Sequence, residues 1–222
     1  MPFMALYVEE LGAPKNKVEW YAGLAVSLSA LASALIAPLW GRLADQYGRK
    51  PMMVRASLVM TFTMGGLAFV PNVFWLLTLR LLNGLFSGYI PNSTALIASQ
   101  APKNRSGYAL GTLATGMIGG SLIGPLLGGM LAEWLGIRQV FLLVGFILLI
   151  CNFLTVFLIK EDFKPVAKAN AMSTRELFLS IKDKQILIGL FVTSMIIQIS
   201  AQSIAPILTL YIRNLGQTEN LM

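Results

Sequence analysis

The sequence predicts an all-α membrane protein, a helical bundle with six full transmembrane helices and the tail of a truncated first helix. Only 12% of the 222 residues are charged, whereas soluble domains carry about 25%. Long uncharged stretches recur between clusters of charge, and a spanning helix needs about 20 mostly apolar residues. These stretches lack the strict alternation of apolar and polar residues typical of membrane β-strands, so a barrel is not expected.

The six full spans are expected where charged residues are absent. They are residues 20–42, 51–70, 73–100, 106–132, 138–160 and 185–212. The 8 apolar residues that precede Glu9 would cover roughly 12 Å as a helix, under half of the hydrocarbon core. We interpret them as the last turns of a helix whose beginning is absent. No basic segment precedes them, so they do not resemble a signal peptide.

Basic residues gather at alternate ends of the expected spans. The loops at 43–50, 101–106 and 161–184, with their flanks, hold 12 of the 17 lysines and arginines. By the positive-inside rule these loops should face the cytoplasm. The third loop contains a capping-box pattern at 173–176 followed by apolar residues on one face. It favours a short amphipathic helix, with an unstructured linker as the alternative.

An internal repeat predicts the domain organisation. The segment PFMALYVEELG at 2–12 matches PILTLYIRNLG at 206–216, which indicates two parallel bundles, a known transporter architecture. We therefore expect three parts. They are a six-helix N-terminal bundle at 1–160 with its first helix truncated, a cytoplasmic linker at 161–184, and the first helix of a C-terminal bundle at 185–222, the rest of which is absent.

The composition excludes several classes of function. The chain has no histidine, which rules out imidazole metal ligands and a histidine-based catalytic triad. Cys151 is the only cysteine, so no intrachain disulfide can form. The basic residues lie between apolar runs and form no continuous patch for nucleic acid. No acid, base and nucleophile cluster in the sequence, so an enzyme, a catalytic residue, a metal site or a bound cofactor is not expected.

The segment GRLADQYGRKP at 41–51 is the first candidate for mechanism. Gly41 and Gly48 would allow close helix approach and a tight turn. Asp45 can accept hydrogen bonds at a helix end or pair with Arg49 or Lys50. The alternative is a basic loop that only obeys the positive-inside rule.

Arg80 is the only charged residue within the expected span 73–100. An arginine at mid-membrane costs about 2.5–3.5 kcal/mol on insertion scales, so Arg80 should face the bundle interior. Asn83, Gly84, Ser87 and Gly88 follow it at helical spacing. Because Arg80 lies only about two turns from the outer end, snorkelling of its side chain to the interface is the alternative.

The expected span 106–132 contains a stripe of glycines. Gly116, Gly120, Gly124 and Gly128 are spaced by four residues and would form one flat surface for close helix packing. Pro125 would add a kink. Such a helix suits a gate between two bundles, although packing alone would also explain the stripe.

These three motifs, in this order, resemble the major facilitator superfamily. The loop is similar to its first signature at Gly41, Asp45, Gly48, Arg49 and Lys50, with Gln46 where a basic residue is frequent. With the truncated first helix counted as the first span, residues 73–100 form the fourth span and residues 106–132 the fifth. The fourth span is similar at Arg80 and Gly84, with Asn83 where glutamine is usual. The fifth span resembles the signature of the drug:proton antiporter-1 branch. Its matching residues are Gly120, Gly124, Pro125, Gly128 and Gly129.

The resemblance implies a fold and a mechanism. Two six-helix bundles would rock about a central site, with the loop as a conformational latch, Arg80 in coupling and the fifth-span glycines as a gate. The chain would belong to a monomeric bacterial plasma-membrane exporter that binds small molecules and protons, uses the proton gradient in place of a cofactor, and binds no nucleic acid. Polar residues expected to line its substrate cavity, or to join helices, are Asn83, Ser87, Asn92, Gln198 and Gln202.

The sequence departs from this expectation in one respect. No Asp or Glu lies inside a complete span, yet a proton-coupled exporter needs a titratable group in the membrane. The carboxylate would then lie at Glu9 or Glu10, in the missing part of the first span, or in the missing second half. Two alternatives to a drug exporter stay open. The fold alone does not exclude a metabolite or sugar symporter of the same superfamily. The truncated first span would also fit a remnant that transports nothing.

Overall fold

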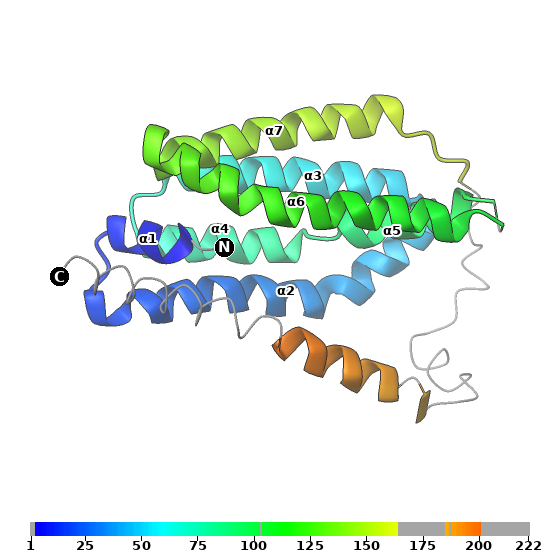
Figure 1. Ribbon diagram of the computed structural model, residues 1–222, viewed down its shortest axis with the longest axis horizontal. Coiled ribbons are helices and arrows are strands. Elements are labelled where there is room, and N and C mark those ends of the chain that lie inside the picture. The colour runs from blue at the N-terminus through cyan, green and yellow to red at the C-terminus, as the bar shows by residue number, and fades with distance from the viewer. Residues whose placement is uncertain (1–2, 103, 164–184, 187, 201–222) are drawn as a thin grey trace, which may run out of the picture. The chain divides into compact units, whose positions relative to one another are not determined.

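The computed structural model describes residues 3–102, 104–163, 185–186 and 188–200. The part of the chain that it describes is helical (Figure 1). The helices are α1 (Phe3–Glu10), α2 (Val18–Tyr47), α3 (Arg49–Gly66), α4 (Val73–Leu85), α5 (Tyr89–Gln100), α6 (Ser106–Leu135) and α7 (Ile137–Leu158), with 3-10 turns η1 (Lys15–Lys17) and η2 (Leu67–Phe69).

A further apolar helix covers Ile188–Ser200. The chain divides into two compact units, residues 3–167 and 168–222. The helices named above up to α7 belong to the first unit, and Ile188–Ser200 belongs to the second. The expected amphipathic helix at 173–176 and the repeat segment at 206–216 lie outside the described residues.

The all-α membrane fold is confirmed. Five helical segments are long and apolar enough to cross a membrane, and each coincides with an expected span. They are Lys15–Tyr47, Arg49–Phe69, Val73–Gln100, Ser106–Leu135 and Ile137–Leu158. The sixth expected span, 185–212, is helical over Ile188–Ser200, and its remainder lies outside the described residues.

Two helices, α2 and α6, extend beyond the carboxyl ends of their expected spans. α2 continues through Arg42 and Asp45 to Tyr47, so most of the expected loop at 43–50 is helix. The difference arises because charge marks where the membrane ends, whereas helical hydrogen bonds continue wherever the backbone allows them. Figure 1 also shows a bend late in α2, and the helix contains Pro38, the kind of residue that bends helices.

Two pairs of helices form the closest crossings. α3 packs on α7, where a Cβ built on Gly145 would lie 2.8 Å from the Gly65 Cα (Figure 1). α2 packs on α4, where a Cβ on Gly84 would lie 2.9 Å from the Ser29 Cα. Both crossings therefore require glycine, as is common where membrane helices pack by contact of their backbones.

The buried core lies where α1 meets the other helices. Tyr7 of α1 is fully buried and its hydroxyl donates to the carbonyl of Leu67. The aromatic ring of Phe141 in α7 lies 5.1 Å from the Tyr7 ring. The short helix α1 is thus fixed by this hydrogen bond, by apolar packing, and by the ion pair of its Glu10 with Arg138 of α7, with 3.2 Å between Oε1 and Nε. The buried apolar side chains of this cluster are Met4, Tyr7, Val8, Val18, Ala25, Met64, Leu67, Val70 and Leu76.

Candidate functional site

The loop motif, residues 41–50, forms the junction between α2 and α3. Gly48 alone separates the two helices, with φ of +99°. Glycine adopts such a positive φ readily, whereas other residues do so at a cost. Asp45 and Arg49 pair across the junction, with 3.5 Å between Oδ1 and Nη2. Gly48 therefore makes the tight turn that the motif predicts.

A carboxylate from far along the chain caps the start of α3. The Glu161 oxygens accept hydrogen bonds from the backbone N–H groups of Arg49 and Lys50, each at 2.8 Å. The first N–H groups of a helix have no partner inside the helix, and negative charge there is favourable to the helix dipole. A Cβ on Gly48 would lie 2.8 Å from Glu161 Oε2 and 3.3 Å from Phe163 Cγ. Gly48 thus also leaves room for the capping carboxylate.

The other positions of the loop motif are more open. Among the described residues, nothing lies within 4 Å of a Cβ built on Gly41. The side chains of Asp45 and Arg49 are 61% and 30% exposed, and an ion pair this exposed contributes about 0–1 kcal/mol. Within this unit, the junction is therefore held mainly by Glu161.

Arg80 of α4 points into the bundle. It is 4% exposed, and its Nη2 lies 3.9 Å from the sulfur of Met4 in α1. The Ser29 hydroxyl of α2 donates to the Arg80 carbonyl at 2.7 Å. The guanidinium is packed among helices, so the burial predicted for Arg80 is observed in place of snorkelling to the interface.

The expected span 73–100 is interrupted. α4 ends at Leu85 and α5 begins at Tyr89, with Gly88 between them at φ of +126°. Sequence patterning predicts one continuous helix here, because the residues that interrupt the apolar stretch are polar but not charged. Gly84 is needed for the close crossing with α2, and Gly88 is needed because the backbone has a positive φ there. Both glycines that follow Arg80 are therefore explained by the fold.

Three glycines of the α6 stripe have no close neighbour among the described residues. Nothing among the described residues lies within 4 Å of a Cβ on Gly116, Gly120 or Gly124. α6 continues through Pro125 to Leu135, and none of its residues is buried within the described part of the chain. The described helices of the first unit therefore give no packing reason for this part of the stripe.

Two of the polar residues proposed for a cavity join helices in this unit. The Thr63 hydroxyl of α3 donates to Asn83 Oδ1 at 3.2 Å. The hydroxyls of Ser33 in α2 and Ser87 lie 2.6 Å apart. These contacts link the fourth span to α2 and α3.

The other three residues expected to line the cavity are Asn92, Gln198 and Gln202, and their surroundings differ. Asn92 is buried and its amide donates to the Gly88 carbonyl at 2.7 Å. Gln198 lies on the helix Ile188–Ser200 and is exposed within its own unit. Gln202 lies outside the described residues. The cavity candidates of the first unit, Asn83, Ser87 and Asn92, therefore lie in or near the break between α4 and α5.

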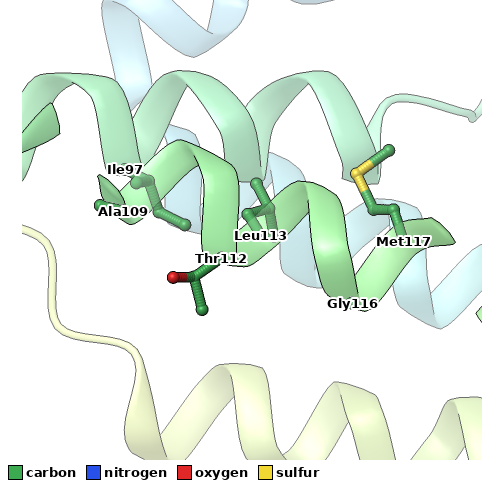
Figure 2. A pocket seen from close by; sticks show the side chains of 6 residues that line it. All are labelled: Ile97, Ala109, Thr112, Leu113, Gly116 and Met117. Atoms are coloured by element: carbon green, nitrogen blue, oxygen red, sulfur yellow. The ribbon is translucent and has the colours of Figure 1, made fainter. Parts of the chain in front are cut away.

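A shallow hollow lies between α5 and α6 (Figure 2). It measures about 470 Å³ and is mostly apolar. Its lining residues are Ile97, Ala109, Thr112, Leu113, Gly116 and Met117. The polar candidates Ser87 and Asn92 do not line it, so it is separate from the break.

The sequence matches the Major Facilitator Superfamily over residues 1–222. The chain belongs to this superfamily. It is 62% identical over 222 residues to the multi-drug resistance efflux pump PmrA of Streptococcus pneumoniae, covering 100% of this chain and 56% of the relative. A PmrA homolog of Lactococcus lactis is also 62% identical, over 223 residues, with 100% and 55% covered.

A more distant relative is the multidrug resistance protein MdtG of Proteus mirabilis. It is 48% identical over 223 residues, covering 100% of this chain and 56% of the relative. The chain spans about half the length of the curated relatives that it matches. It is a multi-pass protein of the bacterial plasma membrane, and its family is one of transporters, not enzymes.

Sequence reasoning missed three residues of this superfamily member. Glu161 caps α3, and Arg55 and Trp40 contact the break in the fourth span. Glu161 follows the apolar run directly and lies between Lys160 and Lys164. An acid in this basic segment could have indicated a specific contact. By its sequence position Arg55 is one more basic residue flanking the first cytoplasmic loop, although it lies more than one turn inside α3. Trp40 carried no signal.

Proposed function

We propose that the whole protein containing this chain is a proton-coupled antiporter that exports drugs or other small lipophilic molecules. The observation that carries the proposal is the 62% identity, over the entire chain, to a protein named a multi-drug resistance efflux pump. The low charge of the spans is compatible with lipophilic cargo. The substrates are small molecules and protons.

The proposed architecture is that of alternating access. Residues 1–160 would form the N-terminal bundle, 161–184 the cytoplasmic linker, and 185–222 the start of a second bundle. Two such bundles moving against each other would expose a midplane site to either side in turn. We expect the complete protein to work as a monomer.

Within this scheme the described residues take four roles. The loop motif would latch one state, with Glu161 as its anchor in the first unit. Arg80, the buried cation of the fourth span, would take part in coupling. The α6 stripe would serve as the gate against the second bundle, because its open glycines leave room for another helix. Ser87 and Asn92, beside the break, would border the substrate path.

A chimaera tests the function. The residues of the pneumococcal relative that match this chain are replaced by the chain, and the chimaera is expressed in cells that lack their own efflux pumps. Ethidium fluorescence is then followed after energisation. We expect efflux that stops when the proton gradient is dissipated. Gradient-driven uptake of a sugar or metabolite without efflux would establish the symporter instead, and an inert, well-expressed chimaera would overturn both.

A further inference from the structure

The break in the fourth span has an unusual chemical requirement. Where a helix stops inside a membrane, its last carbonyls lose their partners, and lipid supplies none. The carbonyls affected here are those of Leu85, Phe86 and Ser87, whereas the Gly88 carbonyl accepts the first backbone hydrogen bond of α5 from the Asn92 N–H at 3.2 Å. Unsatisfied carbonyls in an apolar environment are costly, so each should have a substitute donor.

Side chains from α2 and α3 supply those donors. Trp40 Nε1 of α2 donates to the Leu85 carbonyl at 2.7 Å. Beyond the break, the Asn92 amide of α5 adds a second hydrogen bond, at 2.7 Å, to the Gly88 carbonyl, which also accepts from the Asn92 backbone N–H. Arg55 of α3 reaches the two carbonyls between them.

Arg55 holds the centre of the break. Its Nη2 donates to the Phe86 carbonyl at 3.3 Å and to the Ser87 carbonyl at 3.0 Å. Its guanidinium carbon lies 3.3 Å from the centroid of the Trp40 ring. Arg55 and Trp40 therefore join α2, α3 and the break in one cluster, with the cation stacked on the indole.

This arrangement is expensive for stability alone. Within the part of the chain that the structure describes, no carboxylate pairs with Arg55, and its buried Nε and Nη1 have no hydrogen-bond partner. A partly buried cation without a counter-ion among the described residues carries a desolvation penalty. An unbroken helix with an apolar residue at position 55 would avoid the penalty and the orphan carbonyls together.

We propose that Arg55 is a positioning residue for export, which keeps the fourth span open at Phe86–Gly88 and thereby fixes Ser87 and Asn92. The inference rests on the proposed function of the whole protein. Arg55 does not touch the substrate. It acts through the break, which divides the helix that carries Arg80 from the helix that carries Asn92.

Cysteine cross-linking in the chimaera tests the position of the break directly. All native cysteines, including Cys151, are replaced by serine. Ser33→Cys and Ser87→Cys then form the test pair, because the two hydroxyls lie 2.6 Å apart, compatible with a disulfide. Ser57→Cys and Asn152→Cys form the control pair between α3 and α7, where Asn152 Nδ2 lies 2.7 Å from Ser57 Oγ.

Two substitutions of Arg55 separate its chemistry from its bulk. Arg55→Met removes the donors and the charge but keeps an unbranched apolar chain. We expect it to slow cross-linking of the test pair roughly tenfold, as loss of charge-assisted hydrogen bonds would, and to leave the control pair unchanged. Arg55→Lys keeps a cationic donor and should restore most of the rate.

Transport kinetics provide a measurement that does not depend on how much chimaera is present in the membrane. With efflux normalised to the amount of chimaera, Arg55→Met should raise the ethidium concentration for half-maximal export, because Ser87 and Asn92 are displaced. Arg55→Lys should rescue it. An unchanged half-maximal concentration, unchanged cross-linking of the test pair, or equal slowing of both pairs would each overturn the proposal. If the Arg55 parent itself exports nothing, the proposed function fails, while the cross-linking rates still decide whether Arg55 sets the break.

Discussion

Gly48 and Gly124 belong to two motifs that look equally glycine-rich in the sequence, yet their surroundings are opposite. A Cβ on Gly48 would meet the Glu161 carboxylate and the Phe163 ring, and its φ is positive. A Cβ on Gly124 would meet nothing within 4 Å among the described residues. The first glycine is required by the fold of this unit, and the second is not. Substitutions in the two motifs, and in the contacts around them, should therefore affect unfolding to very different extents.

The largest effect is expected for Gly48→Val. The substitution forces a branched residue into a positive φ, which costs about 1–2 kcal/mol. It also displaces Glu161 from the start of α3, which costs about 1.5–3 kcal/mol more. Thermal unfolding of the chimaera in detergent should show a loss of roughly 2.5–5 kcal/mol. Gly124→Val, the matched control, should unfold like the parent, and similar losses at both positions would refute the contrast.

Glu161→Gln should have the next largest effect. The neutral amide keeps one acceptor oxygen but loses the charge and one of the two hydrogen bonds to α3. We expect a loss of about 1–3 kcal/mol in the free energy of unfolding. Asp162→Asn is the matched control, because it removes the same charge one residue along. If the two variants unfold alike, Glu161 is an ordinary surface acid.

Asp45→Asn should change unfolding little. Its ion pair with Arg49 is exposed, so the loss should stay below about 1 kcal/mol. Export should nevertheless fall, because the motif is proposed to latch one state of the complete transporter. Ethidium efflux per molecule of well-expressed chimaera measures the effect. Efflux equal to the parent would reduce the motif to a determinant of topology.

Gly124→Leu should leave the unfolding of this unit unchanged or slightly improved. Glycine is about 0.8–1 kcal/mol less favourable than good helix formers inside a helix, and no neighbour of this unit is displaced. Export should stop, because the leucine occupies the space proposed for a helix of the second bundle. Transport at the parental rate would show that the stripe faces lipid and is not a gate.

The fold was largely predictable because hydropathy reports on the membrane directly. Five expected spans coincide with long helices, and Gly48 was expected to turn. Glu161 could not be assigned its role, since its partners Arg49 and Lys50 are over a hundred residues earlier and no local pattern joins them. The break at Phe86–Gly88 was hidden for a related reason. Its carbonyls are satisfied by Trp40 and Arg55 of other helices, and helical periodicity does not report such contacts.

The connections between helices differ in how much chain they contain. Gly48 joins α2 to α3, and Gly136 joins α6 to α7 with φ of +86°. A protease must draw several residues into an extended conformation before it can cut, and a one-residue turn offers none. Both junctions should therefore resist digestion and reject inserted epitope tags. The segment between Gln100 and Ser106, where Pro102, Asn104 and Arg105 are exposed, is the place to insert a tag or a cleavage site.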